Sequence, residues 1–227
     1  MTEENGVSEP DARRLPTQIL VVGLWSVVTI AVIAAGLSPI STNSLAGSDD
    51  YMRFVRVFAW LDGAGWYDHT IARLNAPYGA EVAWSRAVDI PLASLLSLLT
   101  PVLGRTDAAL ITASIIPPIV LLGLMFASAA MIRPLVGREN VIVGPTIIVL
   151  LPNLLSSTLP GRVDHHAWQL LLMCLAMGAL ARMVTNQRSG SAVLAGGIFG
   201  MSLWVGGETV PWLAAANAAL AIVWIVD

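Results

Sequence analysis

The chain has 227 residues, of which 56% are hydrophobic and only 12% are charged, and its formal net charge is −3. All 12 basic residues are arginines, and they form no basic patch of the kind that nucleic-acid binding needs. We therefore expect no nucleic acid as a partner. Several apolar runs approach the ~20-residue length that crosses a bilayer, which predicts an all-α, polytopic transmembrane helical bundle.

The N-terminal segment is polar and precedes a long apolar run over residues 19–37. This run exceeds the ~7–15 residues of a signal-peptide core, and further apolar runs follow it, so we predict an uncleaved first span. Arg13 and Arg14 place the tail, residues 1–16, in the cytoplasm by the positive-inside rule. Residues 17–227 are expected to form one transmembrane domain.

The next apolar run decides which loops share a side of the membrane. Residues 90–103 are too few for a span and have the length of an interfacial or re-entrant segment, so we predict that they lie on the membrane. The expected later spans cover residues 108–132, 141–155 and 168–183, with a fifth from residue 192 onward.

The positions of the arginines favour this topology. It places Arg133, Arg138, Arg182 and Arg188 on the cytoplasmic side, as the positive-inside rule requires. A span at 90–103 would instead put the first two outside. Under the favoured topology, the first outer loop (residues 39–89), the segment around Asp164 and the segment around Glu208 all face the outer side.

The first outer loop contains a predicted amphipathic helix that lies on the membrane surface. Ser48 is a suitable N-cap, and Asp49 and Asp50 fall in the first turn, where negative charge favours the exposed amides. Apolar residues recur at helical spacing over residues 52–61, and the helix is expected to end near Gly63.

Charged side chains of this helix have two interpretations. Acids in a first turn are common, so Asp49 and Asp50 are either structural or functional. Arg53 and Arg56 fall on another side than the apolar residues; they are interfacial arginines or a fork that binds a phosphate or pyrophosphate.

Aromatic residues that follow in the loop indicate an interfacial belt or, alternatively, sugar stacking: Trp60, Trp66, Tyr67, Tyr78 and Trp84.

The second outer segment has titratable groups between two apolar runs, which lipid tolerates only where protein or water solvates them. Asp164 and His166 lie two residues apart and offer oxygen and nitrogen ligands for a divalent metal. Manganese or magnesium is favoured, with zinc as the alternative. Asp164 could instead cap the following helix.

Glu208 interrupts the last apolar region. A glutamate there is costly unless it faces a wet cavity or a partner, and the flanking glycines allow backbones to approach closely. Glu208 is therefore either structural or functional.

Three segments together resemble the GT-C membrane glycosyltransferases: 49–53 (Asp-Asp-Tyr-Met-Arg), 84–89 (Trp-Ser-Arg-Ala-Val-Asp) and 161–166 (Gly-Arg-Val-Asp-His-His). Within that superfamily the chain is most similar to the N-terminal half of bacterial and archaeal oligosaccharyltransferase catalytic subunits. Because such proteins continue into further spans and a soluble domain, the resemblance implies a chain truncated at its C-terminus.

The resemblance implies transfer of a sugar or oligosaccharide from a polyprenyl-phosphate or pyrophosphate donor to a protein, lipid or glycan. The site would face the periplasm from a bacterial inner membrane. Asp50, with Asp49 as the alternative, would orient or deprotonate the acceptor. Asp50, Asp164 and His166 would bind Mn²⁺ or Mg²⁺.

Four further side chains are substrate-binding candidates under the resemblance. Arg53, Arg56 or Arg162 would pair with the phosphate, and Glu208 would make a further polar contact. Two other classes of function stay open: a transporter or flippase of lipid-linked sugars, and a non-catalytic membrane scaffold. A transporter needs ionisable groups at mid-membrane depth, whereas these lie mostly in outer loops, which favours the enzyme.

Overall fold

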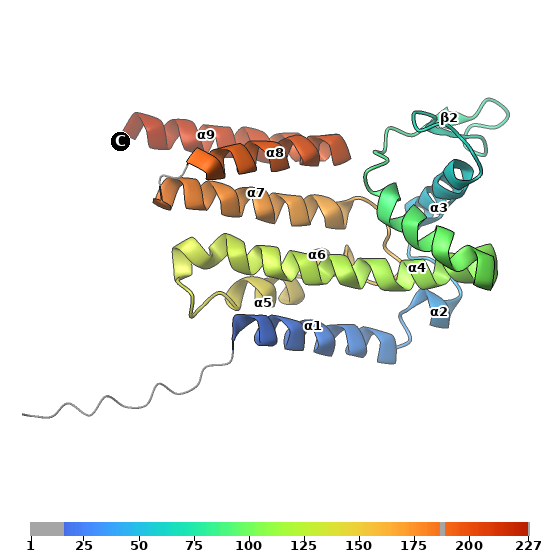
Figure 1. Cartoon of the computed structure of the whole chain (residues 1–227), viewed down its shortest axis with the longest axis horizontal. Helices are drawn as coiled ribbons and strands as arrows, with labels where there is room; N and C mark the ends of the chain where they lie inside the picture. The colour runs from blue at the N-terminus through green and yellow to red at the C-terminus, as the bar shows by residue number, and fades with distance from the viewer. Residues whose placement is uncertain (1–15, 187–188, 227) are drawn as a thin grey trace, which may run out of the picture.

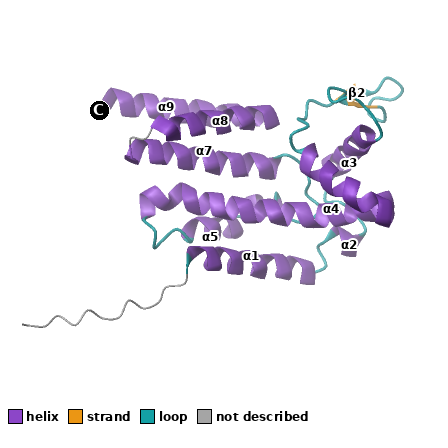
Figure 2. Cartoon of the chain, viewed as in Figure 1, coloured by secondary structure: helices purple, strands orange, loops and turns teal. Residues whose placement is uncertain are grey.

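The computed structural model describes residues 16–186 and 189–226. Most of the predicted tail, and Arg188, lie outside the described residues. The described part is helical apart from a two-stranded antiparallel hairpin in which Thr70 lies opposite Glu81 (Figure 2). The elements in chain order are α1 (Thr17–Ala34), α2 (Pro39–Thr42), α3 (Ser48–Leu61), β1 (Thr70–Ile71), β2 (Ala80–Glu81), α4 (Asp89–Val136), α5 (Val143–Leu150), α6 (Pro152–Ser156), α7 (His166–Asn186), α8 (Ser189–Val205), η1 (Gly207–Thr209) and α9 (Val210–Val226).

The long helices run side by side, and the shorter elements α2, α3 and the hairpin gather at one end of the bundle (Figure 1). Four described segments are long and apolar enough to cross a membrane, which fits an integral membrane protein: Thr17–Thr42, Asp89–Val136, His166–Thr185 and Gly207–Val226. The helix α8 is apolar but shorter.

The bundle core lies where α4 packs against α7. Leu124, Met125 and Cys174 are buried in one cluster there. At Gly178 the two helices approach so closely that a Cβ atom would lie 3.0 Å from the Cα atom of Met131. Small residues at such crossings allow helices in lipid to gain van der Waals contact.

The break in α4 supports the expected surface segment. Gly104 has φ +77° and ψ 168°, which interrupts the helix and which glycine adopts readily. Residues 89–103 turn away from the bundle direction and lie beside α3 (Figure 1). Phe54 and Val57 of α3 pack there against Leu92 and Leu96.

Two predicted spans have different boundaries in the structure. Residues 141–155 do not form one helix, because α5 ends at Leu150 and α6 begins at Pro152. Proline lacks an N–H and disfavours helical geometry in the residue before it, and Leu151 has φ −94° and ψ 105°. The region from residue 192 onward forms two antiparallel helices, α8 and α9, since Gly206 adopts extended backbone geometry before the short turn η1.

The helix α3 begins one residue earlier than predicted. Gly47 occupies the N-cap position, so Ser48 is the first helical residue and its hydroxyl donates to Asp49 Oδ1 (3.2 Å) instead of capping the backbone. The apolar side, with Tyr51 and Val55, is exposed and available to a membrane surface, whereas the opposite side packs against the protein.

Candidate functional site

Asp50 joins α3 to the loop that precedes α7. Its carboxylate is fully buried, and Oδ1 accepts a hydrogen bond from the Val163 N–H (2.7 Å). Oδ2 has no hydrogen-bond partner among the described residues and lies 3.9 Å from Nη1 of Arg162. A Cβ atom at Gly47 would lie 3.2 Å from the same Arg162 nitrogen, so a glycine leaves room for the guanidinium.

The surroundings of Asp50 favour its protonated form. Burial raises the pKa of this carboxyl from 3.8 to about 6; the Val163 hydrogen bond opposes that shift, and the negative charge of Asp164 adds to it. A carboxyl with such a pKa is ionised at neutral pH yet is a better proton acceptor than an exposed aspartate. Asp49, its predicted alternative, is only partly buried and accepts the Ser48 hydroxyl.

Asp164 is buried and caps the N-terminus of α7. Its Oδ1 accepts a hydrogen bond from the His166 N–H (3.0 Å). This contact is the helix cap that we gave as the alternative to metal binding. The capping contact does not engage its second oxygen.

The expected metal ligands do not form a complete set. Within residues 16–186 and 189–226, no group of three or more His, Cys, Asp or Glu side chains is arranged to hold a metal ion. Asp50 nevertheless offers an unpartnered oxygen beside the charge of Asp164. This donor set suits a hard cation that binds one or two carboxylates and takes its other ligands from water and substrate phosphate. The role of His166 as a metal ligand stays a prediction.

Arg53 and Arg56, the expected phosphate fork, face inward instead. The carboxylate of Asp89 lies 2.8 Å from Arg53 Nη1, 3.4 Å from Arg56 Nη2 and 3.3 Å from Arg86 Nη1, and all four side chains are buried. The guanidinium groups of Arg53 and Arg56 also lie near the ring of Trp84, at 4.9 and 5.9 Å from its centroid. These contacts close the arginines off from substrate and fix α3 on α4.

Two other members of this cluster had no role in the sequence prediction. Asp89 appeared only as the end of the 84–89 segment, and the signal that could have found it is an aspartate at the start of an apolar helix, where it needs a cationic partner. His69, which showed no sequence partner, lies 3.1 Å from Arg56 Nη2.

Glu208 reaches the same end of the bundle through His165. The imidazole Nε2 lies 3.2 Å from Glu208 Oε1, its Nδ1 lies 3.4 Å from Arg53 Nη2, and Gln169 donates to Glu208 Oε2 (2.8 Å). Burial lowers the pKa of His165, and the hydrogen bond to Glu208 acts against that shift. The three segments predicted to share the outer side therefore meet, although His165 and Gln169 had no assigned role.

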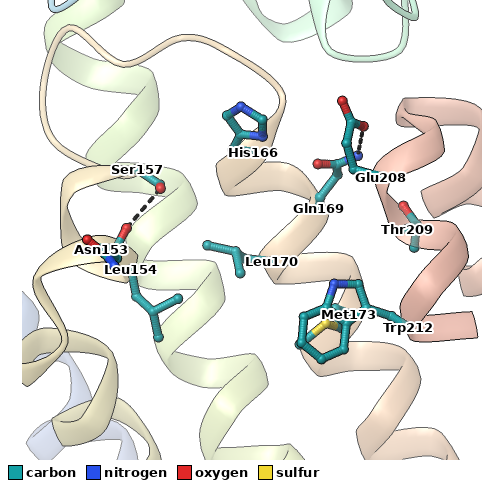
Figure 3. Close-up of a pocket in the computed structure, with 10 residues that line it drawn as sticks. All are labelled: Asn153, Leu154, Ser157, His166, Gln169, Leu170, Met173, Glu208, Thr209 and Trp212. Atoms are coloured by element: carbon teal, nitrogen blue, oxygen red, sulfur yellow. Dashed lines mark hydrogen bonds between the residues drawn. The ribbon is translucent and has the colours of Figure 1, made fainter. Parts of the chain in front are cut away.

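A groove of about 270 Å³ opens beside Glu208 (Figure 3). One end of it is polar, with His166, Gln169 and Glu208. From there it runs along α7 past Leu170 and Met173, while Asn153 and Ser157 add polar groups to the facing wall (Figure 3). Its apolar lining comprises Leu154, Leu170, Met173 and Trp212.

Arg162 differs from Arg53 and Arg56 in its exposure. Its side chain is 39% exposed and lines a second cavity of about 280 Å³ together with Leu45 and Pro160. It is therefore the predicted phosphate-binding arginine that a ligand can reach.

Comparison of the chain with models of known protein families, with characterised proteins and with solved structures gave no match. The functional argument therefore rests on the residues and geometry described above.

Proposed function

We propose that the chain is a GT-C-type membrane glycosyltransferase, similar to an oligosaccharyltransferase catalytic subunit. It would transfer a sugar or oligosaccharide from a polyprenyl-phosphate or pyrophosphate donor to an acceptor at the periplasmic face of a bacterial inner membrane. The observation that carries the proposal is the buried Oδ2 of Asp50, which accepts no hydrogen bond from the described residues, lies near Asp164 and is at the same end of the bundle as an amphipathic groove.

The groove beside Glu208 suits an amphiphilic ligand. A lipid-linked sugar has a long apolar chain and a polar head, and the groove has an apolar wall along α7 and a polar end at His166, Gln169 and Glu208. The chain would lie against Leu170 and Trp212, which directs the head toward the outer end of the bundle.

The charged residues divide into two groups. Asp50 orients or deprotonates the acceptor, because its Oδ2 is buried and accepts no hydrogen bond from the described residues. Arg162 pairs with the donor phosphate, since its guanidinium is reachable and only weakly engaged. Arg53 and Arg56 position α3 on α4, because their guanidinium groups are already in contact with Asp89 and Trp84.

A divalent cation, Mn²⁺ or Mg²⁺, is part of the proposal. Asp50 and Asp164 would hold it, with the remaining ligands supplied by water and donor phosphate. When bound, such a cation neutralises charge that develops on a leaving phosphate.

Photo-crosslinking tests the donor assignment. A polyprenyl phosphate with a photoreactive group near its phosphate should label peptides that contain His166–Gln169 and Glu208 in purified protein, and unlabelled polyprenyl phosphate should compete. Arg162→Gln should weaken labelling, whereas Arg73→Gln, which removes an exposed outer-loop arginine, should not. Labelling confined to the outward surfaces of α1 and α9 would overturn the proposal.

A further inference from the structure

The end of the bundle opposite Asp50 contains a second group of arginines. Arg133 and Arg138 both line a cavity of about 420 Å³ with Thr17 and Gln18. They also line a cavity of about 430 Å³ with Arg182 and Thr185. These two arginines therefore stand between two cavities, one toward α1 and one toward α7.

The backbone places the arginines on this boundary. Arg133 is in the last turn of α4, and Gly137 ends the helix with φ +75°, a conformation that favours glycine. The Gly137 N–H donates to the Arg133 carbonyl (3.1 Å), so the chain turns back and Arg138 lines the same cavities as Arg133.

The three guanidinium groups have no fixed counter-charge in the described part of the chain. Arg133, Arg138 and Arg182 make no side-chain hydrogen bond or ion pair with the described residues, while the neighbouring Glu139 has an interaction of its own. Their situation differs from that of Arg53, Arg56 and Arg86, which share Asp89.

Apolar residues lie next to the charges, mainly in the cavity toward α1. Phe126, Ala129 and Val141 line the cavity toward α1, and Ala130 lines both. A site with cationic groups at its mouth and apolar walls within a helical bundle matches a phospholipid whose phosphate is at the surface and whose acyl chains are in the membrane. Two cavities that share two arginines match a lipid with two phosphates.

We propose that this end of the protein binds a phospholipid with two phosphates, cardiolipin, through Arg133, Arg138 and Arg182. One phosphate lies in each cavity, and the acyl chains follow the apolar walls into the inner leaflet. The site is independent of sugar transfer, because it lies at the opposite end of the bundle from Asp50.

The test measures cardiolipin retained by the purified full chain. Native mass spectrometry of wild-type protein should show one bound cardiolipin that resists delipidation, with an apparent affinity at least about tenfold higher than for phosphatidylglycerol. Arg133→Gln/Arg138→Gln should abolish this preference, whereas Arg73→Gln/Arg105→Gln, which removes two arginines from the other end, should retain it.

Competition distinguishes the possible sources of phosphate. Inorganic pyrophosphate should fail to displace cardiolipin at millimolar concentration, because it lacks acyl chains; displacement would identify a site for a soluble phosphate and overturn the lipid assignment. Equal retention of cardiolipin and phosphatidylglycerol at matched charge would show only the general attraction of arginines to an anionic leaflet, and would also overturn it. Circular dichroism checks that the double variants fold.

Discussion

Two buried aspartates at the end of the bundle near α3 differ in their surroundings. Asp89 is in contact with three guanidinium groups, whereas Asp50 keeps an oxygen without a hydrogen-bond partner and lies near the charge of Asp164. A buried carboxylate that is fully paired with cations has a structural role. A carboxyl with a perturbed pKa and an oxygen that accepts no hydrogen bond is a candidate for a catalytic role. The difference separates the structural contacts of Asp89 from the catalytic role proposed for Asp50.

The raised pKa of Asp50 predicts how stability depends on pH. Because its folded pKa of about 6 exceeds the unfolded value of 3.8, its favourable contribution is complete below about pH 4 and is lost as the pH rises through 6. Asp50→Asn does not ionise, so relative to wild type it should gain about 2–3 kcal/mol in unfolding free energy between pH 4 and pH 8.

Asp62→Asn provides the matched control, measured by thermal or denaturant unfolding in detergent. Arg105 lowers the pKa of this exposed aspartate, so its contribution is present above the unfolded pKa and is lost as the pH falls. The Asp62 variant should therefore show a small change of opposite sign. A difference between wild type and Asp50→Asn that does not vary with pH would contradict the burial argument.

Asp89→Asn should destabilise the protein by about 3–5 kcal/mol, since it leaves three buried guanidinium groups without their counter-charge. The same substitution at Asp62 breaks an exposed pair that water screens, so it should change stability little. Unfolding of both variants at neutral pH gives the comparison. Similar values for the two would show that the cluster around Asp89 is solvated.

Part of the site could be predicted at this scale. Asp164 and Glu208 were candidates because ionisable groups beside apolar runs need protein or water to solvate them, whereas Asp50 was a candidate through the resemblance to the GT-C glycosyltransferases. The partners of Arg53 and Arg56 could not be predicted, because Asp89 is distant in sequence and only the packing of α3 on α4 brings it near.

The helix α3 connects the predicted membrane surface with the site. Its exposed side includes Tyr51, Val55 and Leu61, and its buried side includes Asp50 and Arg53. The loop beyond it, residues 62–88, exposes Tyr67 and Tyr78, at 86% and 85%. These two tyrosines fit the interfacial belt, whereas Trp60 and Trp66 pack edge to face, with ring centroids 5.2 Å apart.

The crossing of α4 and α7 depends on a glycine. Gly178→Ala would place a Cβ atom 3.0 Å from Met131 Cα, where backbone must move, so we expect a loss of about 1–3 kcal/mol. Gly197→Ala in α8 meets no atom within 4 Å and should be neutral or slightly stabilising, because alanine favours helix. Unfolding of the pair in detergent measures both effects, and equal stability would contradict the close packing.

Helix boundaries could be predicted where a residue such as glycine marks them in the sequence. They could not be predicted where the conformation of the folded chain determines them. Gly63 indicated the end of α3 within two residues, while the extended conformation of Leu151 before Pro152 divides an apolar run that hydropathy alone reads as one span. Glu208 and its flanking glycines marked an interruption of the last apolar region, but the turn that Gly206 to Thr209 form between two helices was not predicted.

The whole molecule has two distinct ends. The end near α3 brings together Asp50, Asp164, His165 and Glu208, and the opposite end has the cavities lined by arginines. The ionisable groups of the site lie at the bundle end, which agrees with surface chemistry better than with a transport path through mid-membrane.

Labelling of single cysteines tests this sidedness. In a Cys174→Ser background, Tyr67→Cys should react with a membrane-impermeant maleimide added to intact spheroplasts, because the residue is exposed in the outer loop. Asn140→Cys, in the exposed turn after α4, should react only after permeabilisation. The reverse pattern would place Asp50 in the cytoplasm and contradict the proposed topology.

The central claim is that Asp50 acts in sugar transfer from a polyprenyl-linked donor. The most direct measurement is release of polyprenyl phosphate or pyrophosphate from lipid-linked sugars in proteoliposomes, with acceptor fractions and Mn²⁺ or Mg²⁺ supplied. We predict turnover by wild type and Asp62→Asn, loss of at least about 10²-fold in Asp50→Asn, and loss on chelation. Equal turnover by Asp50→Asn and wild type, or movement of intact donor across the bilayer without cleavage, would contradict the account.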